Sequence, residues 1–173
     1  INPLPVDVVV PCPHRMVGTY ECLDSVRGQD HLDVRLWVLD QGSGRPMIEG
    51  LRVRARDEGF TFVEDGRTGV AAGRNHGYRM GSAPVIVALD NDAVLADPGV
   101  LTRAARRVGE NPRLGALAFS VHDYSRGGPD LGNWGYPWPA ASHFDCEFLT
   151  ARFSGGGHAI ARRAFEETDG YDE

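Results

Sequence analysis

The sequence predicts an α/β fold in which helices cover both faces of a doubly wound, mostly parallel sheet. Short apolar runs alternate along the chain with longer segments that show helical spacing, and several of these runs end in polar residues. Strands that alternate with helices form parallel sheets, and ligands of such sheets collect at the carboxyl ends of the strands. With 173 residues, of which 42% are hydrophobic, the chain is long enough for one domain with a substantial core.

The first seven elements are expected to alternate between strand and helix. Each expected strand is an apolar run, and each expected helix repeats apolar or small residues at helical spacing. Pro11 is expected to break the first strand, and Thr68 to cap the third helix. We expect strands over residues 6–10, 34–39, 60–63 and 85–89, and helices over residues 20–26, 47–58 and 69–80.

The second half opens with a helix whose start is indicated by Asp97 and Pro98, a cap residue followed by proline at the first helical position. Residues 114–121 are expected to form a fifth strand. From residue 122 to residue 151, glycines and prolines are interleaved with Trp134, Tyr136 and Trp138. This composition predicts a long irregular loop of the kind that often carries binding. A last helix is expected to begin near Arg162, after a glycine-rich bend.

Composition restricts the class of protein. The net charge of -6 argues against non-specific binding of nucleic acid, and no apolar run approaches the length that spans a bilayer. The three cysteines lack C-x-x-C spacing and are expected to be reduced thiols in the cytosol. Because the chain begins with Ile and stops at G-Y-D-E, we expect it to be part of a longer protein.

The fourth expected strand ends in two aspartates that are one residue apart. Asp90 and Asp92 flank Asn91 directly after an apolar run. Two carboxylates at one strand end repel each other unless a positive charge lies between them. Divalent cations such as Mg²⁺ and Mn²⁺ take oxygen ligands of this type and share their coordination with substrate phosphates. This D-x-D pattern therefore suggests a metal site; the alternative is a polar turn in which Asp92 or Asp97 caps the next helix.

Asp40 follows the second strand in the same way, within L-D-Q-G-S. One interpretation is that Asp40 accepts a hydrogen bond from the ring N–H of a nucleobase, while Gly42 and Ser43 shape the turn. The alternative is a turn that only leads the chain out of the strand.

Residues 69–77, G-V-A-A-G-R-N-H-G, combine small residues with Arg74. Small residues let the backbone approach a neighbour or a ligand, and the planar guanidinium of Arg74 suits a phosphate or a base. The alternative is a helix packed tightly on the sheet, with Arg74 in a structural ion pair. His158 has similar alternatives, as a metal or phosphate contact or as an ordinary hydrogen-bonded residue.

These segments together resemble a known family. V-V-V-P-C-P-H-R, V-L-D-Q-G-S, G-V-A-A-G-R-N-H-G followed by the strand and D-N-D, and F-S-G-G-G-H-A-I-A-R-R-A-F-E-E-T-D-G-Y-D-E occur in this order from residue 6 to residue 173. Their order and spacing resemble family 2 glycosyltransferases, which are enzymes of the GT-A fold that use nucleotide-sugar donors. The resemblance covers nearly the whole chain.

The resemblance implies roles for individual residues. Asp40 would read the nucleobase, Arg74 would help to hold the nucleotide, and Gly155, Gly156 and Gly157 would border the sugar and acceptor pocket. Residues implied in nucleotide binding are Pro11, Cys12, Pro13, Arg15, Asp40, Arg74, Asp90 and Asn91, and those implied in metal binding are Asp90 and Asp92. The family's acidic catalytic base is expected beyond residue 173, so no residue of this chain is assigned to that role.

Trp134 and Trp138 are assigned to the acceptor side, because the C–H faces of sugars stack on aromatic rings. The alternative is that these rings anchor the loop to the sheet, as large buried aromatic side chains do. On this interpretation, residues 6–121 bind the nucleotide-sugar, and residues 122–173 form the acceptor-side loop and the closing segment.

The expected activity is inverting transfer of a sugar from a nucleoside-diphosphate donor, of uridine or thymidine type, to an acceptor hydroxyl with the help of Mg²⁺ or Mn²⁺. One alternative is a nucleotide-sugar-binding domain without turnover. Another is a sugar-phosphate nucleotidyltransferase, which generally needs a glycine-rich basic loop after the first strand. The expected location is the cytoplasm or the cytoplasmic face of a membrane, and no nucleic-acid partner is expected.

Overall fold

The computed structural model describes residues 4–13, 16–31, 33–67, 69–130, 146–151, 153 and 155–172. Helices and strands alternate along most of the chain. The elements are β1 (Val6–Cys12), α1 (Met16–Arg27), β2 (Val34–Asp40), α2 (Arg45–Glu58), β3 (Thr61–Glu64), α3 (Val70–Met80), β4 (Val85–Leu89), α4 (Val100–Glu110), β5 (Ala116–Ala118), β6 (His122–Asp123), β7 (Gly128–Pro129), β8 (Gly157–Ala161) and α5 (Arg162–Thr168).

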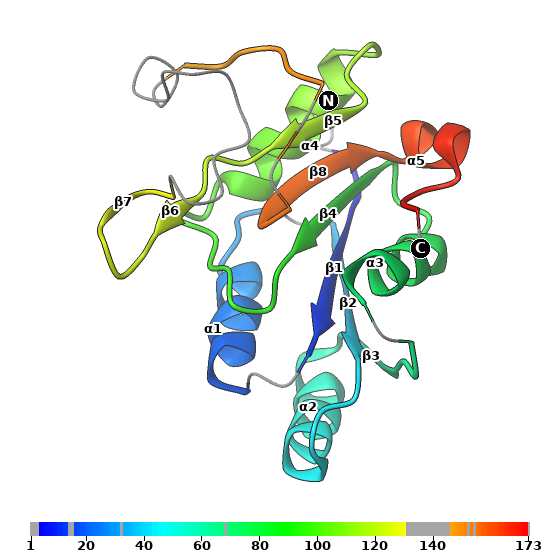
Figure 1. The fold of residues 1–173 in the computed structure, drawn as a ribbon, viewed down its shortest axis with the longest axis vertical. Coiled ribbons are helices and arrows are strands. Elements are labelled where there is room, and N and C mark those ends of the chain that lie inside the picture. The colour runs from blue at the N-terminus through cyan, green and yellow to red at the C-terminus, as the bar shows by residue number, and fades with distance from the viewer. Residues whose placement is uncertain are drawn as a thin grey trace.

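The main sheet has six strands in the order β3-β2-β1-β4-β8-β5 (Figure 1). β1 pairs in parallel with both β2 and β4, and β2 pairs in parallel with β3. β8 is the exception, because it runs antiparallel between β4 and β5. The chain moves outward from β1 to β3 and then returns to β4 on the other side of β1. The crevice between the carboxyl ends of β1 and β4 is therefore a topological switch point, where sheets of this kind bind ligands.

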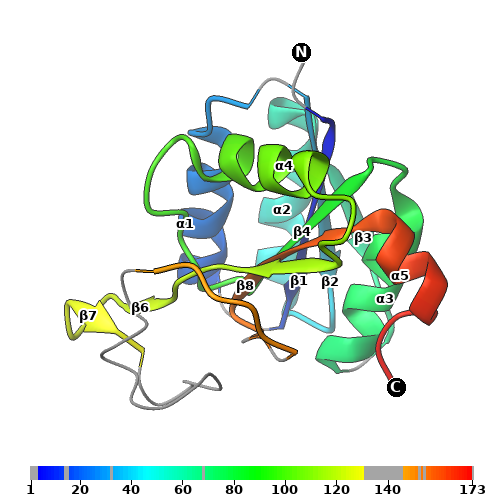
Figure 2. The ribbon, with the colours of Figure 1, turned by 90° about the horizontal axis from the view of Figure 1, so that it is seen from above.

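Helices cover both faces of the sheet, as Figure 2 shows from above. On one face α1, α2 and α4 bury apolar side chains, including Leu23, Leu51 and Leu101, against alternate residues of the strands. On the other face Tyr78 of α3 and Phe165 of α5 pack against Val9 and Ile86. Successive side chains of a strand point to opposite faces of the sheet. A sheet that is covered on both faces therefore needs apolar residues at both odd and even positions of its strands. The predicted fold class is confirmed.

β1 continues through Pro11 to Cys12, whereas the sequence predicted a break at Pro11. β4 pairs only with the Val6–Val9 part of β1, while β2 pairs with β1 as far as Cys12. Beyond Val9, β1 therefore has one neighbour and behaves as an edge strand, where proline is tolerated.

Several helix starts also differ from the prediction. α4 begins at Val100 after Gly99, and Asp97 accepts a hydrogen bond from the Gly99 N–H at 2.8 Å and pairs with Arg103. Asp97 thus closes the turn before the helix instead of capping the helix itself. α2 begins at Arg45, two residues earlier than expected, and α3 is preceded by Gly69, with Thr68 outside the described residues.

The largest difference lies after α4. The expected fifth strand is reduced to Ala116–Ala118, and the loop expected from residue 122 begins with the short β6–β7 hairpin. β8 was expected only as part of a glycine-rich bend before the last helix, yet all five of its residues are buried. Small residues occupy three of its five positions, Gly157, Ala159 and Ala161, and they hide its apolar period.

Within the described segments, no helix is long and apolar enough to cross a membrane.

Candidate functional site

Two neighbouring pockets open at the carboxyl ends of the strands. The first, called here the D-N-D pocket, has a volume of about 240 Å³ and is lined by Pro11, Pro13, Gln41, Val70, Asp90, Asn91 and Asp92. The second, called the acidic pocket, has a volume of about 290 Å³ and is lined by Asp40, Gln41, Gly42, Glu64, Asp65 and Gly66. The D-N-D pocket lies at the switch point between β1 and β4, and the acidic pocket lies at the ends of β2 and β3.

The D-N-D turn is held from below by α1. Asn91 points inward, and its Nδ2 donates to Thr19 Oγ1 at 2.8 Å, while the Cys22 thiol donates to the Asp90 carbonyl at 3.6 Å. Gly18 lets α1 approach this turn, because a Cβ on Gly18 would lie only 3.2 Å from the Cβ of Asp92. The buried amide of Asn91 therefore fixes the turn, and the exposed Asp92 is on the side of the pocket.

Arg74 and Asp90 form an ion pair beside this pocket. Nη2 of Arg74 lies 2.7 Å from Asp90 Oδ1 and donates to the Gly155 carbonyl at 2.6 Å. The Arg74 side chain is 8% exposed and that of Asp90 is 43% exposed. Burial raises the pKa of the Asp90 carboxyl, Arg74 opposes this rise, and the charge of Asp92 adds to it. A cation between Asp90 and Asp92 would relieve the repulsion that contributes to this raised pKa.

The structure also brings the predicted glycines to the ion pair. A Cβ on Gly155 would lie 3.2 Å from Nη1 of Arg74, and one on Gly156 would lie 4.0 Å from Oδ2 of Asp90. The Gly156 carbonyl accepts a hydrogen bond from the Asp90 N–H at 3.4 Å, and Gly157 begins β8. Residues 155 and 156 thus border the D-N-D turn, although they lie far from it in sequence.

Asp40 forms a turn at the end of β2, which both interpretations of the sequence include. Its carboxylate accepts hydrogen bonds from the backbone N–H groups of Gly42 and Ser43, the shortest at 3.1 Å. The residue is 3% exposed and lines the acidic pocket. Each carboxylate oxygen has more than one lone pair, so these two contacts leave acceptor capacity for a ligand N–H.

The residues at and just after the end of β1 separate into two groups. Pro11 and Pro13 line the D-N-D pocket, whereas the Cys12 side chain is fully buried in the core and only its carbonyl is directed to the site, where it accepts from the Gln41 N–H at 3.2 Å. Burial raises the pKa of the Cys12 thiol well above its ordinary value. Burial, reinforced by the charges of Asp92 and Asp90, raises the pKa of the Cys22 thiol to about 12. Neither thiol is therefore a nucleophile. Arg15, Trp134 and Trp138 lie outside the described residues.

His158 is a buried structural residue. Its Nε2 lies 3.0 Å from the Tyr78 hydroxyl and 2.9 Å from the Tyr171 hydroxyl. Burial, together with the charge of Arg74, lowers its pKa to about 3, which keeps the ring neutral. The contacts of His158 therefore agree with its interpretation as an ordinary hydrogen-bonded residue.

Oxygen donors at the D-N-D pocket suit a divalent cation. Across the described segments, no group of three or more His, Cys, Asp or Glu side chains is placed to hold a metal. Asp90 and Asp92 supply two carboxylates beside an open pocket, and Mg²⁺ is commonly held by one or two carboxylates together with waters and substrate phosphates. The donor set therefore fits a cation that completes its coordination with a bound phosphate.

Sequence reasoning missed Gln41, Glu64 and Asp65, which line the acidic pocket. Burial opposes ionisation of Asp65, but hydrogen bonds from His76 and Arg67 outweigh it and lower the pKa of its carboxyl. The signal was available, because β3 ends in Glu64 and is followed by Asp65, much as β2 ends in Asp40. The carbonyl of Asp40 accepts from the Asp65 N–H at 2.8 Å, so the parallel pairing of the two strands brings the acidic residues together.

The family model for glycosyl transferase family 2 matches residues 7–169 of this chain. The chain belongs to glycosyl transferase family 2. A curated relative, an uncharacterized glycosyltransferase of Rickettsia bellii (strain RML369-C), is 28% identical over 87 residues, which cover 50% of this chain and 13% of the relative. The match thus covers a small part of that relative's length.

Solved structures of the GT-A fold superpose on this family 2 chain. Mannosyltransferase PcManGT from Pyrobaculum calidifontis, in complex with GDP-Man and Mn²⁺, gives a TM-score of 0.77 at 21% identity, with 98% of this chain and 48% of that chain covered. S. aureus TarS 1-349 in complex with UDP-GlcNAc gives 0.72 at 17% identity, with 96% and 48% covered. The expected GT-A architecture is confirmed, and the chain spans about half the length of these two structures.

Proposed function

We propose that this chain is the donor-binding part of a glycosyltransferase that moves a sugar from a nucleoside-diphosphate-sugar to an acceptor hydroxyl with inversion. The observation that carries the proposal is the pair Asp90 and Asp92 at the topological switch point, with Arg74 paired to Asp90, in a chain of glycosyl transferase family 2. Carboxylates at this position repel a diphosphate unless a cation intervenes.

The two pockets divide a nucleotide between them in this proposal. The diphosphate lies in the D-N-D pocket with Asp92 and Asp90 as metal ligands, and the base lies in the acidic pocket, where Asp40 accepts its ring N–H. Pro11 and Pro13, which line the D-N-D pocket, border the nucleotide on that side. One ring N–H for one acceptor suits a uridine or thymidine donor. The two solved structures above carry a guanosine and a uridine nucleotide-sugar, so both bases belong in the test.

A cation, Mg²⁺ or Mn²⁺, would supply Lewis-acid stabilisation of the charge that develops on the leaving diphosphate. Arg74 holds Asp90 in place and limits its rotation, and Asn91 fixes the turn through Thr19. The acceptor hydroxyl enters on the side of Gly155 and Gly156, with Trp134 and Trp138 proposed as the acceptor-side wall. A carboxylate removes the hydroxyl proton in inverting transfer, and none of the residues described here is assigned to that step.

The proposed arrangement assigns different roles to the two parts of the chain. We propose that residues 6–121 bind the nucleotide-sugar and that residues 122–173 contribute the acceptor side and close the site. β8 is shared between these roles, because it pairs with β4 in the sheet while the glycines before it border the ion pair.

Calorimetry with uridine and guanosine diphosphates, each with Mn²⁺ and with a chelator, tests the proposal. We expect binding with Mn²⁺ that weakens by about tenfold or more under chelation, because the repulsion between diphosphate and carboxylates returns. Equal affinity in both conditions would remove the metal from the site, and no binding of either nucleotide would refute donor binding. Tight binding without sugar transfer by the longer protein would favour a nucleotide-sugar-binding domain without turnover.

A further inference from the structure

Gln41 lies between the D-N-D pocket and the acidic pocket and lines both of them. It is 8% exposed and follows Asp40 at the end of β2. In the proposed function the base occupies one pocket and the diphosphate the other. A nucleotide that occupies both pockets therefore extends across Gln41.

The side chain of Gln41 ties the end of β2 to the start of α3. Its Nε2 donates to the Arg67 carbonyl at 3.2 Å and to the Gly69 carbonyl at 2.9 Å, which uses both N–H bonds of the amide. Its backbone N–H donates to the Cys12 carbonyl at 3.2 Å. One residue therefore links the end of β1, the end of β2 and the chain that leads from β3 into α3.

Two glycines make this link possible. Gly69 has φ of 100°, a conformation that favours glycine, and its carbonyl also accepts the Gly73 N–H of the first turn of α3 at 3.1 Å. A Cβ on Gly73 would lie 2.6 Å from Gln41 Nε2 and 2.9 Å from its Cδ, too close for an undisturbed amide. The backbone and the packing are thus both adapted to the position of this side chain.

The wall of the acidic pocket depends on the same contact. Asp65 and Gly66 line that pocket and directly precede Arg67, whose carbonyl Gln41 holds. The D-N-D pocket is held by other contacts, namely Asn91 to Thr19 and Arg74 to Asp90 and Gly155. Gln41 also lines the D-N-D pocket, but the turn that carries the two carboxylates has these contacts of its own. Loss of the Gln41 amide would therefore shift the wall of the acidic pocket relative to that turn and leave the turn itself in place.

We propose that Gln41 is a positioning residue that fixes the separation between the base pocket and the diphosphate pocket, so that a single nucleoside diphosphate fits both. This inference rests on the proposed function. It assigns no contact with reacting atoms to Gln41. Its consequence is that binding of a ligand that spans the two pockets depends on Gln41, whereas binding of a ligand confined to the D-N-D pocket does not.

The test compares two ligands on Gln41→Met, which keeps the length of the side chain and removes both donors. Calorimetry with Mn²⁺ present measures the affinity for pyrophosphate and for uridine or guanosine diphosphate, whichever the unmodified protein binds more tightly. We expect nucleotide affinity to fall about tenfold, since two hydrogen bonds that set the pocket are lost, while pyrophosphate affinity changes by less than about threefold.

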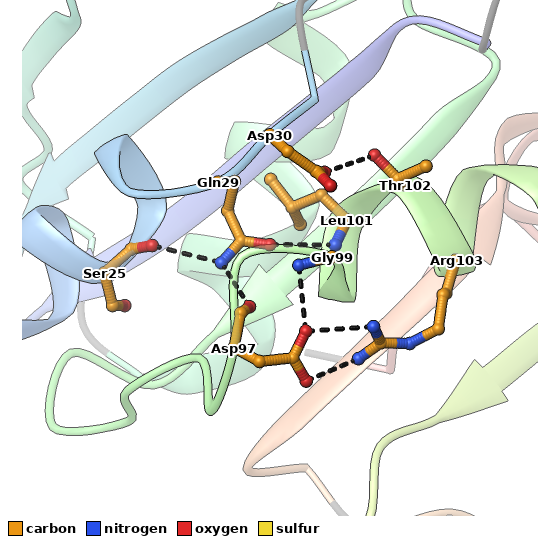
Figure 3. A network of polar contacts seen from close by, with 8 residues as sticks. All are labelled: Ser25, Gln29, Asp30, Asp97, Gly99, Leu101, Thr102 and Arg103. Atoms are coloured by element: carbon orange, nitrogen blue, oxygen red, sulfur yellow. Dashed lines mark hydrogen bonds and ion pairs between the residues drawn. The ribbon is translucent and has the colours of Figure 1, made fainter.

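Gln29→Met is the matched control. Gln29 Nε2 donates to the carbonyls of Ser25 and Asp97 at 3.2 and 2.8 Å, and its Oε1 accepts from the Leu101 N–H at 3.0 Å (Figure 3). This amide clamps backbone in the same way, but it lies after the carboxyl end of α1, away from both pockets. We expect Gln29→Met to lower the melting temperature without changing the ratio of nucleotide to pyrophosphate affinity.

Gly73→Ala provides a second route to the same displacement, because the added Cβ pushes on the amide while Gln41 itself is unchanged. It decides the question if Gln41→Met does not fold, and it is expected to change the affinity ratio in the same direction. Equal losses for both ligands, or no loss for either, overturn the positioning role while donor binding by the unmodified protein stands. Failure of the unmodified protein to bind nucleotide overturns the proposed function and this inference together.

Discussion

Asp90 and Asp92 have different surroundings although one residue separates them. Asp90 is partly buried and paired with the buried Arg74, while Asp92 is exposed at the pocket. Their contributions to stability are therefore expected to differ more than their contributions to metal binding. Mutation of each separates the two roles.

Asp92→Asn should remove most of the metal-dependent part of nucleotide affinity and leave the melting temperature nearly unchanged, because the side chain is exposed. Asp90→Asn should reduce nucleotide affinity and also lower the melting temperature, because it leaves the charge of a buried arginine without its ion-pair partner. Calorimetry with and without chelator and a thermal melt of each variant measure both effects. A stable Asp90→Asn protein would show that Arg74 does not depend on this pair.

His158 makes the stability of the fold depend on pH. Its pKa is about 3 in the folded state and near the ordinary 6.5 when unfolded, so the unfolded state binds more protons between these values. Stability from this residue is complete above about pH 6.5 and falls by up to about 1.4 kcal/mol per pH unit as pH decreases through the window. The raised pKa of Asp90 acts in the opposite direction, because that contribution is lost as pH rises.

His158→Gln isolates this effect, since Asp90 and the other carboxylates are the same in both proteins. We expect the variant to be less stable than the unmodified protein at pH 8, because the substitution removes the contacts of the buried imidazole. Between pH 6.5 and pH 4.5 its stability should fall less steeply than that of the unmodified protein. Denaturant unfolding at four or five pH values measures the slopes. Identical slopes would mean that His158 does not titrate as a buried neutral residue.

At the scale of elements, α3 connects the D-N-D turn to the segment after α5. Arg74 reaches Asp90 on one side, and the next residue, Asn75, clamps the backbone of Tyr171 from both directions, with its Nδ2 2.8 Å from the Tyr171 carbonyl and its Oδ1 2.9 Å from the Tyr171 N–H. Arg79 one turn later contacts Asp169. The segment after α5 is therefore fastened to the helix that holds Asp90.

Asn75→Ala should loosen that segment while β1 to β4 stay folded, because the substitution removes both clamping hydrogen bonds, each worth about 1 kcal/mol. Native-state hydrogen exchange should show faster exchange at the Tyr171 amide and little change in β1. Asn111→Ala is the control, because the Asn111 side chain accepts a hydrogen bond from the Arg113 N–H in an exposed turn after α4. Unchanged exchange at Tyr171 in Asn75→Ala would contradict the clamp.

Elements with a continuous apolar run could be predicted from sequence, whereas elements built from small residues could not. β4 consists of Val85, Ile86, Val87, Ala88 and Leu89 and was expected with its observed bounds. β8 alternates small residues with His158 and Ile160, and its identity as a strand depends on pairing with β4 and β5, which are distant in sequence. The same distinction holds in the site. The strand-end aspartates were visible one by one, but Gln41 acquires its meaning only from contacts with Arg67 and Gly69.

At the scale of the whole molecule, binding of donor nucleotide should stabilise the entire fold. The two pockets are lined by residues from or next to β1, β2, β3 and β4, so a ligand bound across them has to dissociate before the sheet unfolds. With free ligand at one hundred times its dissociation constant, the gain is about 2.7 kcal/mol. A thermal shift measured with nucleotide and Mn²⁺ together should exceed the sum of the shifts with each alone. Simple additivity would indicate that metal and nucleotide bind independently.

The position of β8 has a consequence for synthesis of the protein. β4 is complete at Leu89, but the strand that covers its open side does not exist until Ala161 has left the ribosome. During that interval the nascent chain presents an unpaired, wholly apolar strand edge, which is a template for aggregation. The long sequence separation between β4 and β8 also slows their pairing, because a large loop must close first. Chaperones that shield apolar strands, and the rate of translation through residues 90–160, should therefore influence how much of the newly made chain reaches its native state.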